Sequence, residues 1–246
     1  MANKYPTECF RSWLPLLLAG FCLAFSANRA TVASDLITPK LSIPTSHASN
    51  TEPQSWQSAV VSLRVPTRRL VNGERSHHEE LCSGTVIGHK PTTVLTAWHC
   101  FDGYDDLSNP PMVLINGLWH QGRLRQHGKS MRADWAILTV KGNHDVSRVN
   151  IDTSSQYLQL GRKIIVAGFD KTDAGERQLI IEHDCTIAAL AEQWISSDCS
   201  AKRGASGGPI LVRDGPTIAV IGVISALRNE WELLFAPIRG ISTRVD

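Results

Sequence analysis

The chain has 246 residues, of which 42% are hydrophobic and 20% charged, and its formal net charge is +2. Lys4, Arg11 and Arg29 outweigh Glu8 within the first 29 residues, so the remainder is close to neutral. A nucleic-acid partner normally requires a basic stripe on the protein, so this charge balance argues against one.

The N-terminal stretch has the pattern of a secretory signal. Lys4 and Arg11 form a positively charged start, residues 13–25 are mostly apolar, and small residues follow as cleavage sites. This apolar run is short for a membrane span, which needs about 20 residues. We therefore expect a signal peptide over residues 1–30, a secreted or periplasmic protein, and only transient contact with the membrane. An uncleaved signal anchor and lipidation at Cys22 stay open as alternatives.

The rest of the chain predicts a short lead-in followed by many short strands. Residues 31–55 are rich in Ser, Thr, Pro and Asn, which predicts a flexible lead-in or a propeptide. Short β-branched apolar runs then alternate with turn-forming residues, without the βαβ pattern of a parallel sheet. An all-β sandwich or barrel is expected. The predicted strands cover residues 59–65, 85–87, 93–96, 136–140, 164–167, 210–212 and 218–224.

Three short motifs carry the chemistry of a nucleophilic hydrolase. His99 lies in Thr96-Ala97-Trp98-His99-Cys100, Asp134 precedes the apolar run Trp135-Ala136-Ile137-Leu138, and Ser206 lies in Gly204-Ala205-Ser206-Gly207-Gly208-Pro209. A serine hydroxyl needs an imidazole to accept its proton and a carboxylate to fix the imidazole tautomer. The order His, Asp, Ser is that of chymotrypsin-like proteases, not of subtilisins or α/β-hydrolases. Considered without the other two motifs, Asp134 could simply be a residue that caps a turn, and Ser206 could be an incidental part of a Gly-Pro turn.

From about Trp56 to the C-terminus, these motifs resemble the trypsin/chymotrypsin family, and most closely its compact bacterial branch. The resemblance implies an all-β fold of two six-stranded antiparallel β-barrels with the active site in the cleft between them. Residues 56–150 would form the first barrel, with His99 and Asp134, and residues 151–246 the second, with Ser206.

The same resemblance assigns roles to the site residues. His99 would be the general base and then the acid, Asp134 the carboxylate that orients it, and Ser206 the nucleophile. The N–H groups of Gly204 and Ser206 would form the oxyanion hole. Ser225 would support Asp134 and, with Leu227, belong to the strand that binds substrate, although a plain buried strand serine is an alternative for Ser225.

Four cysteines follow the predicted signal: Cys82, Cys100, Cys185 and Cys199. An even number in an exported chain suggests disulfides, and four cysteines allow three pairings. The family resemblance pairs Cys82 with Cys100, which leaves Cys185 and Cys199 for each other. No Cys-x-x-Cys spacing is present, so neither a metal nor another cofactor is expected.

Several positions depart from the family pattern. Ala205 stands where zymogen-activated relatives carry an aspartate that pairs with the new N-terminus. Residues 69–74 look like an activation site, but we interpret them as a loop between strands. Leu227 and Leu233 stand where glycines keep the trypsin pocket open, which favours small or medium apolar residues at the cleaved position.

The sequence therefore predicts a secreted or periplasmic serine endopeptidase that works through an acyl-enzyme on peptide or protein substrates, as a monomer. The alternative is a catalytically silent homologue that acts as a binding module.

Overall fold

The computed structural model describes residues 55–105, 109–171, 176–191, 194–229, 232–239 and 241. The predicted signal peptide, and the lead-in up to residue 54, lie outside these residues and stay predictions. The described part is built from strands, short 3-10 turns and loops, with no α-helix among these residues. Within the same ranges, no helix is long and apolar enough to cross a membrane.

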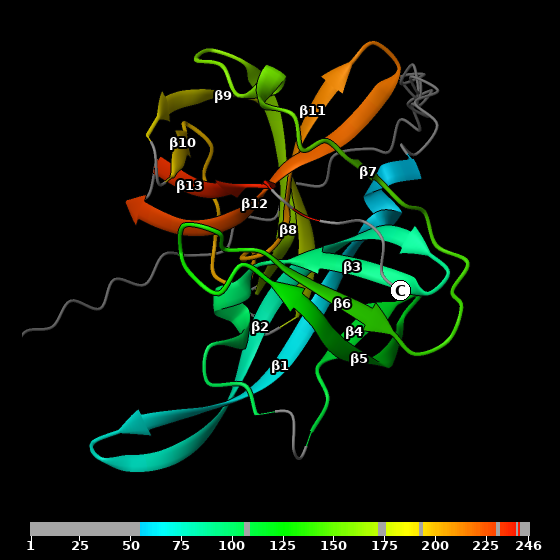
Figure 1. Ribbon diagram of the computed structural model, residues 1–246, viewed down its shortest axis with the longest axis vertical. Coiled ribbons are helices and arrows are strands. Elements are labelled where there is room, and N and C mark those ends of the chain that lie inside the picture. The colour runs from blue at the N-terminus through cyan, green and yellow to red at the C-terminus, as the bar shows by residue number, and fades with distance from the viewer. Residues whose placement is uncertain are drawn as a thin grey trace, which may run out of the picture. The chain divides into compact units, whose positions relative to one another are not determined.

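The first six strands close into an antiparallel barrel (Figure 1). Its strand order is β1-β2-β3-β6-β5-β4. Strands β3 and β6 pair with each other and are buried along their whole length, and every one of their residues is apolar or a threonine. The strands are β1 (Val60–Val71), β2 (Glu74–His89), β3 (Thr92–Thr96), β4 (Met112–Ile115), β5 (Leu118–His127) and β6 (Ala136–Val140).

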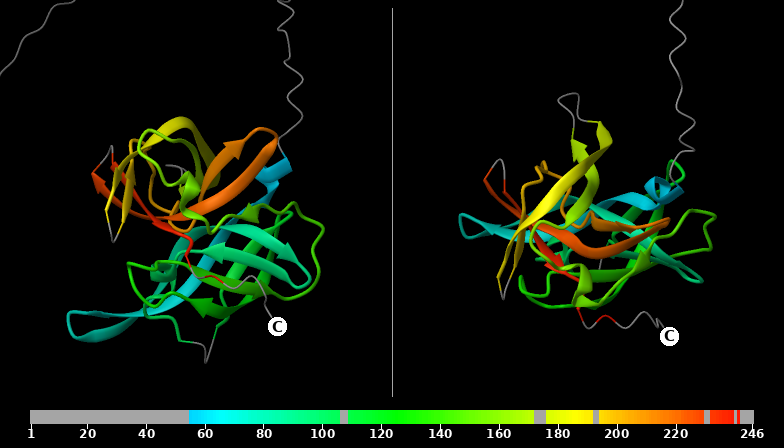
Figure 2. Two further views of the ribbon diagram at one scale, coloured as in Figure 1. Left: turned by 45° about the horizontal axis from the view of Figure 1, so that its top comes forward. Right: turned by 90° about the horizontal axis from the view of Figure 1, so that it is seen from above.

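A second antiparallel barrel follows in the chain, and its later strands are yellow to red in Figure 2. Its strand order is β11-β8-β9-β10-β13-β12, and pairing of β11 with β12 closes it. The predicted fold class of two six-stranded antiparallel barrels is thus confirmed. The strands are β8 (Lys163–Lys171), β9 (Arg177–Leu190), β10 (Ile195–Ser197), β11 (Pro209–Asp214), β12 (Thr217–Asn229) and β13 (Glu232–Pro237), with β7 (Asn150–Ile151) added in parallel to β12.

Apolar side chains join the two barrels through strand β8, whose residues alternate between two faces. Ile164 and Val166 pack inside the second barrel with residues such as Phe235. Ile165 and Ala167 point the other way and belong to the core cluster of the first barrel. The two barrels therefore share a buried interface.

The hairpin of β1 and β2 accounts for the segment that looked like an activation site. Asn72 and Gly73 both have positive φ, 53° and 84°, as a two-residue type I′ turn requires. Leu70 lies within β1 and pairs with Arg75 of β2. The turn is therefore shorter than the predicted loop, and Figure 1 shows the hairpin extending beyond the rest of the barrel.

Candidate active site

His99 lies directly after strand β3, in a 3-10 turn of Trp98–Phe101. The next residue, Cys100, forms a disulfide with Cys82 of β2. Strand β3 pairs with β2 as well, so the turn that carries His99 is attached to β2 on both sides. The disulfide is the pairing that the family resemblance implied.

Asp134 lies in the connection between β5 and β6 and is fully buried. Its carboxylate accepts a hydrogen bond from the His99 backbone N–H at 2.8 Å and lies 2.7 Å from His99 Nδ1. The Ser225 hydroxyl of β12 donates to the same carboxylate at 2.5 Å. A carboxylate bound to Nδ1 keeps the proton on that nitrogen, which leaves Nε2 free to act as a base.

Ser206 lies in the turn that leads into β11. Its carbonyl accepts a hydrogen bond from the Ser83 N–H at 2.7 Å and lies 3.9 Å from the sulfur of Cys100. Because the disulfide sulfur carries no hydrogen, the second approach is a packing contact. The turn that carries Ser206 is therefore fixed against the residue that follows His99.

Gly207 is what allows this close approach of the two barrels. A Cβ there would lie 2.1 Å from Thr96 Oγ1 and 2.4 Å from the carbonyl oxygen of Ser83. The residue also has a φ of +81°, a conformation that glycine adopts without strain. A larger residue would push the serine turn away from the end of β3.

The peptides on either side of Ala205 are held by hydrogen bonds within the turn. The Ala205 N–H donates to the Lys202 carbonyl at 3.1 Å, and the Ala205 carbonyl accepts from the Gly208 N–H at 2.8 Å. Within the described ranges, neither the Gly204 N–H nor the Ser206 N–H donates to a backbone carbonyl.

A small cavity of about 70 Å³ adjoins the loop before Ser206. Its wall also holds Asp170, which forms an ion pair with Lys202 at 3.3 Å, and Glu182, which accepts hydrogen bonds from the Ser200 N–H and hydroxyl. Leu227, 42% exposed on β12, and the fully buried Leu233 do not line it. Its apolar lining consists of Val166, Ile180, Ala201, Ala205 and Ile224.

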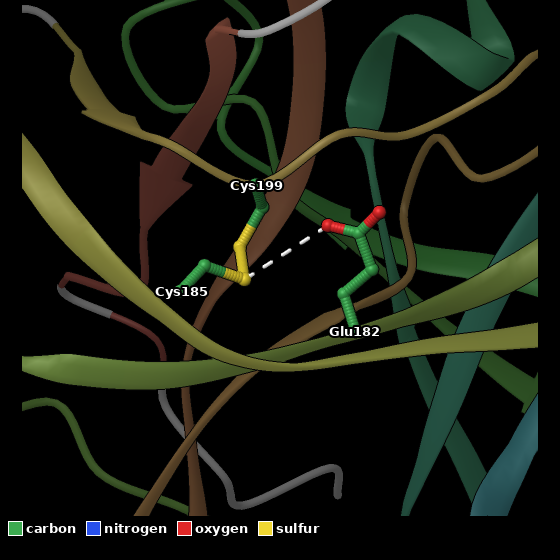
Figure 3. A group of neighbouring side chains, drawn as sticks. All are labelled: Glu182, Cys185 and Cys199. Atoms are coloured by element: carbon green, nitrogen blue, oxygen red, sulfur yellow. Dashed lines mark hydrogen bonds between the residues drawn. A yellow bond between two sulfur atoms is a disulfide. The ribbon is translucent and has the colours of Figure 1, made fainter.

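Cys185 and Cys199 form the second disulfide, as expected. Glu182 lies beside it, and the three residues bring potential ligand atoms within 4.8 Å of one another (Figure 3). The dashed contact joins the Glu182 carboxylate to the Cys185 sulfur at 3.9 Å. A metal would need thiolates, and both sulfurs here are used in the disulfide. The disulfide and the hydrogen bond from the Ser200 N–H to Glu182 therefore hold the start of the loop that precedes Ser206.

Two residues near the site carry no sequence motif. The Arg177 guanidinium of β9 contacts the Gly204 carbonyl oxygen at 2.9 Å, and Ser83 Oγ donates to the same oxygen at 2.7 Å. Burial lowers the pKa of Arg177 to about 10, so the group stays charged at neutral pH. The sequence offered one weak signal for Ser83, its position directly after Cys82, and none for Arg177.

Two closed antiparallel barrels, with a buried carboxylate bonded to an imidazole on one and a glycine-flanked serine turn on the other, are the features of trypsin-like peptidases. The sequence agrees with this assignment. Residues 82–223, more than half of the chain, match the family model for the trypsin-like peptidase domain, and the chain belongs to that family.

Solved structures show the same fold at low sequence identity. The active form of the Rv3671c protease from M. tuberculosis matches with a TM-score of 0.56 and 17% identity, covering 75% of this chain and 79% of that one. The thermostable serine protease AL20 from an extremophilic microorganism matches with a TM-score of 0.55 and 13% identity, covering 74% and 91%. No curated protein sequence matches this chain.

Proposed function

We propose that this protein is a serine endopeptidase in which Ser206, His99 and Asp134 act together. The observation that carries the proposal is the bonding of the buried Asp134 carboxylate to both the backbone and the ring of His99. The Ser206 carbonyl packs against the sulfur of Cys100, the next residue after His99, which supports a productive position for the serine.

In the proposed reaction, Ser206 Oγ attacks the substrate carbonyl carbon and His99 Nε2 accepts the hydroxyl proton. The tetrahedral oxyanion accepts hydrogen bonds from the N–H groups of Gly204 and Ser206, each worth about 3–4 kcal/mol. His99 then gives its proton to the leaving amine as the peptide bond breaks. Water, deprotonated by the same imidazole, hydrolyses the acyl-enzyme and frees Ser206.

Strand β12 would hold the substrate in an extended conformation. Ser225 on this strand already bonds to Asp134, so the strand is tied to the proposed triad. The exposed Leu227 two residues on would contact a substrate side chain. Main-chain hydrogen bonds between the substrate and β12 would add binding affinity without requiring a particular substrate sequence.

We take the small cavity beside Ala205 as the pocket for the substrate residue before the cleaved bond, which would restrict that residue to a small or medium apolar one. Its volume of about 70 Å³ is well below the roughly 150 Å³ of a cavity that holds benzene, so an aromatic ring does not fit. Asp170 in its wall is already paired with Lys202 and offers little attraction to a basic side chain.

Two disulfides are typical of proteins outside the cytosol. Together with the predicted signal peptide, they support a secreted or periplasmic location. We propose that the protein acts there on peptides or proteins, as a monomer and without a cofactor.

A peptide library incubated with the purified protein tests this function. We expect cleavage mainly after Ala, Val or similar residues, and no cleavage by the S206A variant. Cleavage dominated by Arg or Lys would contradict the proposed specificity, while the absence of any cleavage would favour a silent homologue that binds peptides.

A further inference from the structure

The peptide group between Gly204 and Ala205 lies at the centre of the proposed oxyanion hole. The Gly204 N–H comes just before this peptide in the chain and the Ser206 N–H just after it, so the orientation of this peptide affects both donors. Its atoms are coplanar, and fixing both its oxygen and its hydrogen fixes the whole unit. The Ala205 N–H is held by the Lys202 carbonyl. What holds the Gly204 oxygen therefore decides where the two donors point.

Arg177 supplies much of that hold. Its guanidinium donates to the Gly204 oxygen at 2.9 Å, to the Phe169 carbonyl at 3.1 Å and to the Leu63 carbonyl at 3.1 Å. These carbonyls come from the nucleophile loop, from β8 of the second barrel and from β1 of the first barrel. One planar cation thus ties the loop to both barrels, and the fork of an arginine suits such multiple contacts.

Ser83 holds the same oxygen from another direction. Its hydroxyl accepts a hydrogen bond from the Phe169 N–H at 2.7 Å and donates to the Gly204 oxygen at 2.7 Å. The Ser83 N–H also binds the Ser206 carbonyl. Ser83 and Arg177 together give the Gly204 oxygen two donors, both anchored at Phe169.

We propose that Arg177, assisted by Ser83, is a positioning residue that holds the oxyanion loop in its active arrangement. Ala205 is buried directly after Gly204, and its methyl group has no charge with which to pair an N-terminal amine. In zymogen-activated relatives, an aspartate at this position forms an ion pair with the new N-terminus. Here the contacts of Arg177, which form as the chain folds, would take the place of that ion pair. This inference rests on the proposed peptidase function and adds that the site needs no new N-terminus to become active.

The test compares R177M with R177K and with a matched control, R162M. Arg162 is also an arginine of the second barrel, which donates to one carbonyl and lies over the Tyr157 ring, in contact with neither Gly204 nor Ser206. We expect R177M to lose about 10- to 100-fold in kcat with little change in KM, because small misplacements of catalytic groups cost this much. R177K should recover part of the loss, and R162M should match the wild type.

Hydrogen exchange of the segment 200–208 gives a second readout that does not depend on activity. We expect faster exchange in R177M than in R162M at equal thermal stability. If R177M has the kcat of the wild type and the same hydrogen-exchange rate in segment 200–208, Arg177 does not hold the oxyanion loop and the proposal is wrong. An inactive wild-type protein whose loop still loosens in R177M would support this role of Arg177 and refute the peptidase function instead, so the two failures are distinguishable.

Discussion

At the scale of single residues, the buried Asp134 is the group on which the proposed site depends most. A fully buried carboxylate is costly unless it accepts hydrogen bonds, and here three donors come from His99 and Ser225. Because His99 and Ser225 belong to different barrels, this one side chain couples the two halves of the proposed site.

S225A should remove one of these donors from the buried Asp134 carboxylate. Hydrogen bonds to charged groups contribute about 1.5–3 kcal/mol, so we expect a loss of this size in the free energy of unfolding, together with lower kcat. S197A is the control, because the buried Ser197 hydroxyl has no hydrogen-bond partner among the described residues. Urea unfolding measures both, and equal effects of the two substitutions would contradict this role of Ser225.

Site residues that lie in short recognisable motifs can be predicted from the sequence. Residues whose role depends only on contacts formed in the folded protein cannot. His99, Asp134 and Ser206 each lie in a recognisable segment, and the Ser225 bond to Asp134 agrees with its expected supporting role. Arg177 is different, since the carbonyls of Leu63 and Gly204 that it binds are distant in the chain and no local motif around Arg177 indicates them.

At the scale of elements, the barrels meet where the turn before β11 packs against the end of β3. Gly207 makes the contact possible, because the Thr96 hydroxyl and the Ser83 carbonyl occupy the space that a side chain would need.

G207A should therefore be more destabilising than an alanine at another glycine with the same backbone conformation. Gly117 is the matched control, with a φ of +77° and open space around its Cβ position. Positive φ costs an alanine about 1–2 kcal/mol at either site. Overpacking adds about 1–3 kcal/mol at Gly207 only. Similar unfolding free energies and activities for G207A and G117A would argue against this contact.

The strand pattern was predictable where strands are buried and not where they are partly exposed. The runs 93–96, 136–140 and 164–167 are apolar and lie in β3, β6 and β8. Strand β5 has one buried residue among its ten, and polar residues interrupt its sequence, so it lacks the apolar run that indicates a strand. Strand β9 contains short apolar stretches, but Glu182, His183 and Asp184 separate them, and its pairing with β8 shows that they form one strand.

At the scale of the whole molecule, the shared core predicts that the two barrels unfold together. Ile165 and Leu211 of the second barrel belong to the same buried cluster as Leu63 and Leu138 of the first. Separating the barrels would expose this surface to water, which costs about 25 cal/mol per Å².

We therefore expect a single unfolding transition in urea, with the same midpoint by tryptophan fluorescence and by far-UV circular dichroism. The described residues of both barrels belong to one compact unit, which agrees with this expectation. Two separate transitions would show that the barrels are independent and that the interface contributes little to stability.

Labelling with a fluorophosphonate probe tests the central claim, that Ser206 is a nucleophile activated by His99 and Asp134. Mass spectrometry of the labelled wild-type protein should locate the probe on Ser206. S206A should stay unlabelled, H99A should lose nearly all labelling, and D134N should react about 10⁴-fold more slowly because its imidazole adopts the wrong tautomer. Folded wild-type protein that takes no label, or H99A labelled at the wild-type rate, would contradict the account.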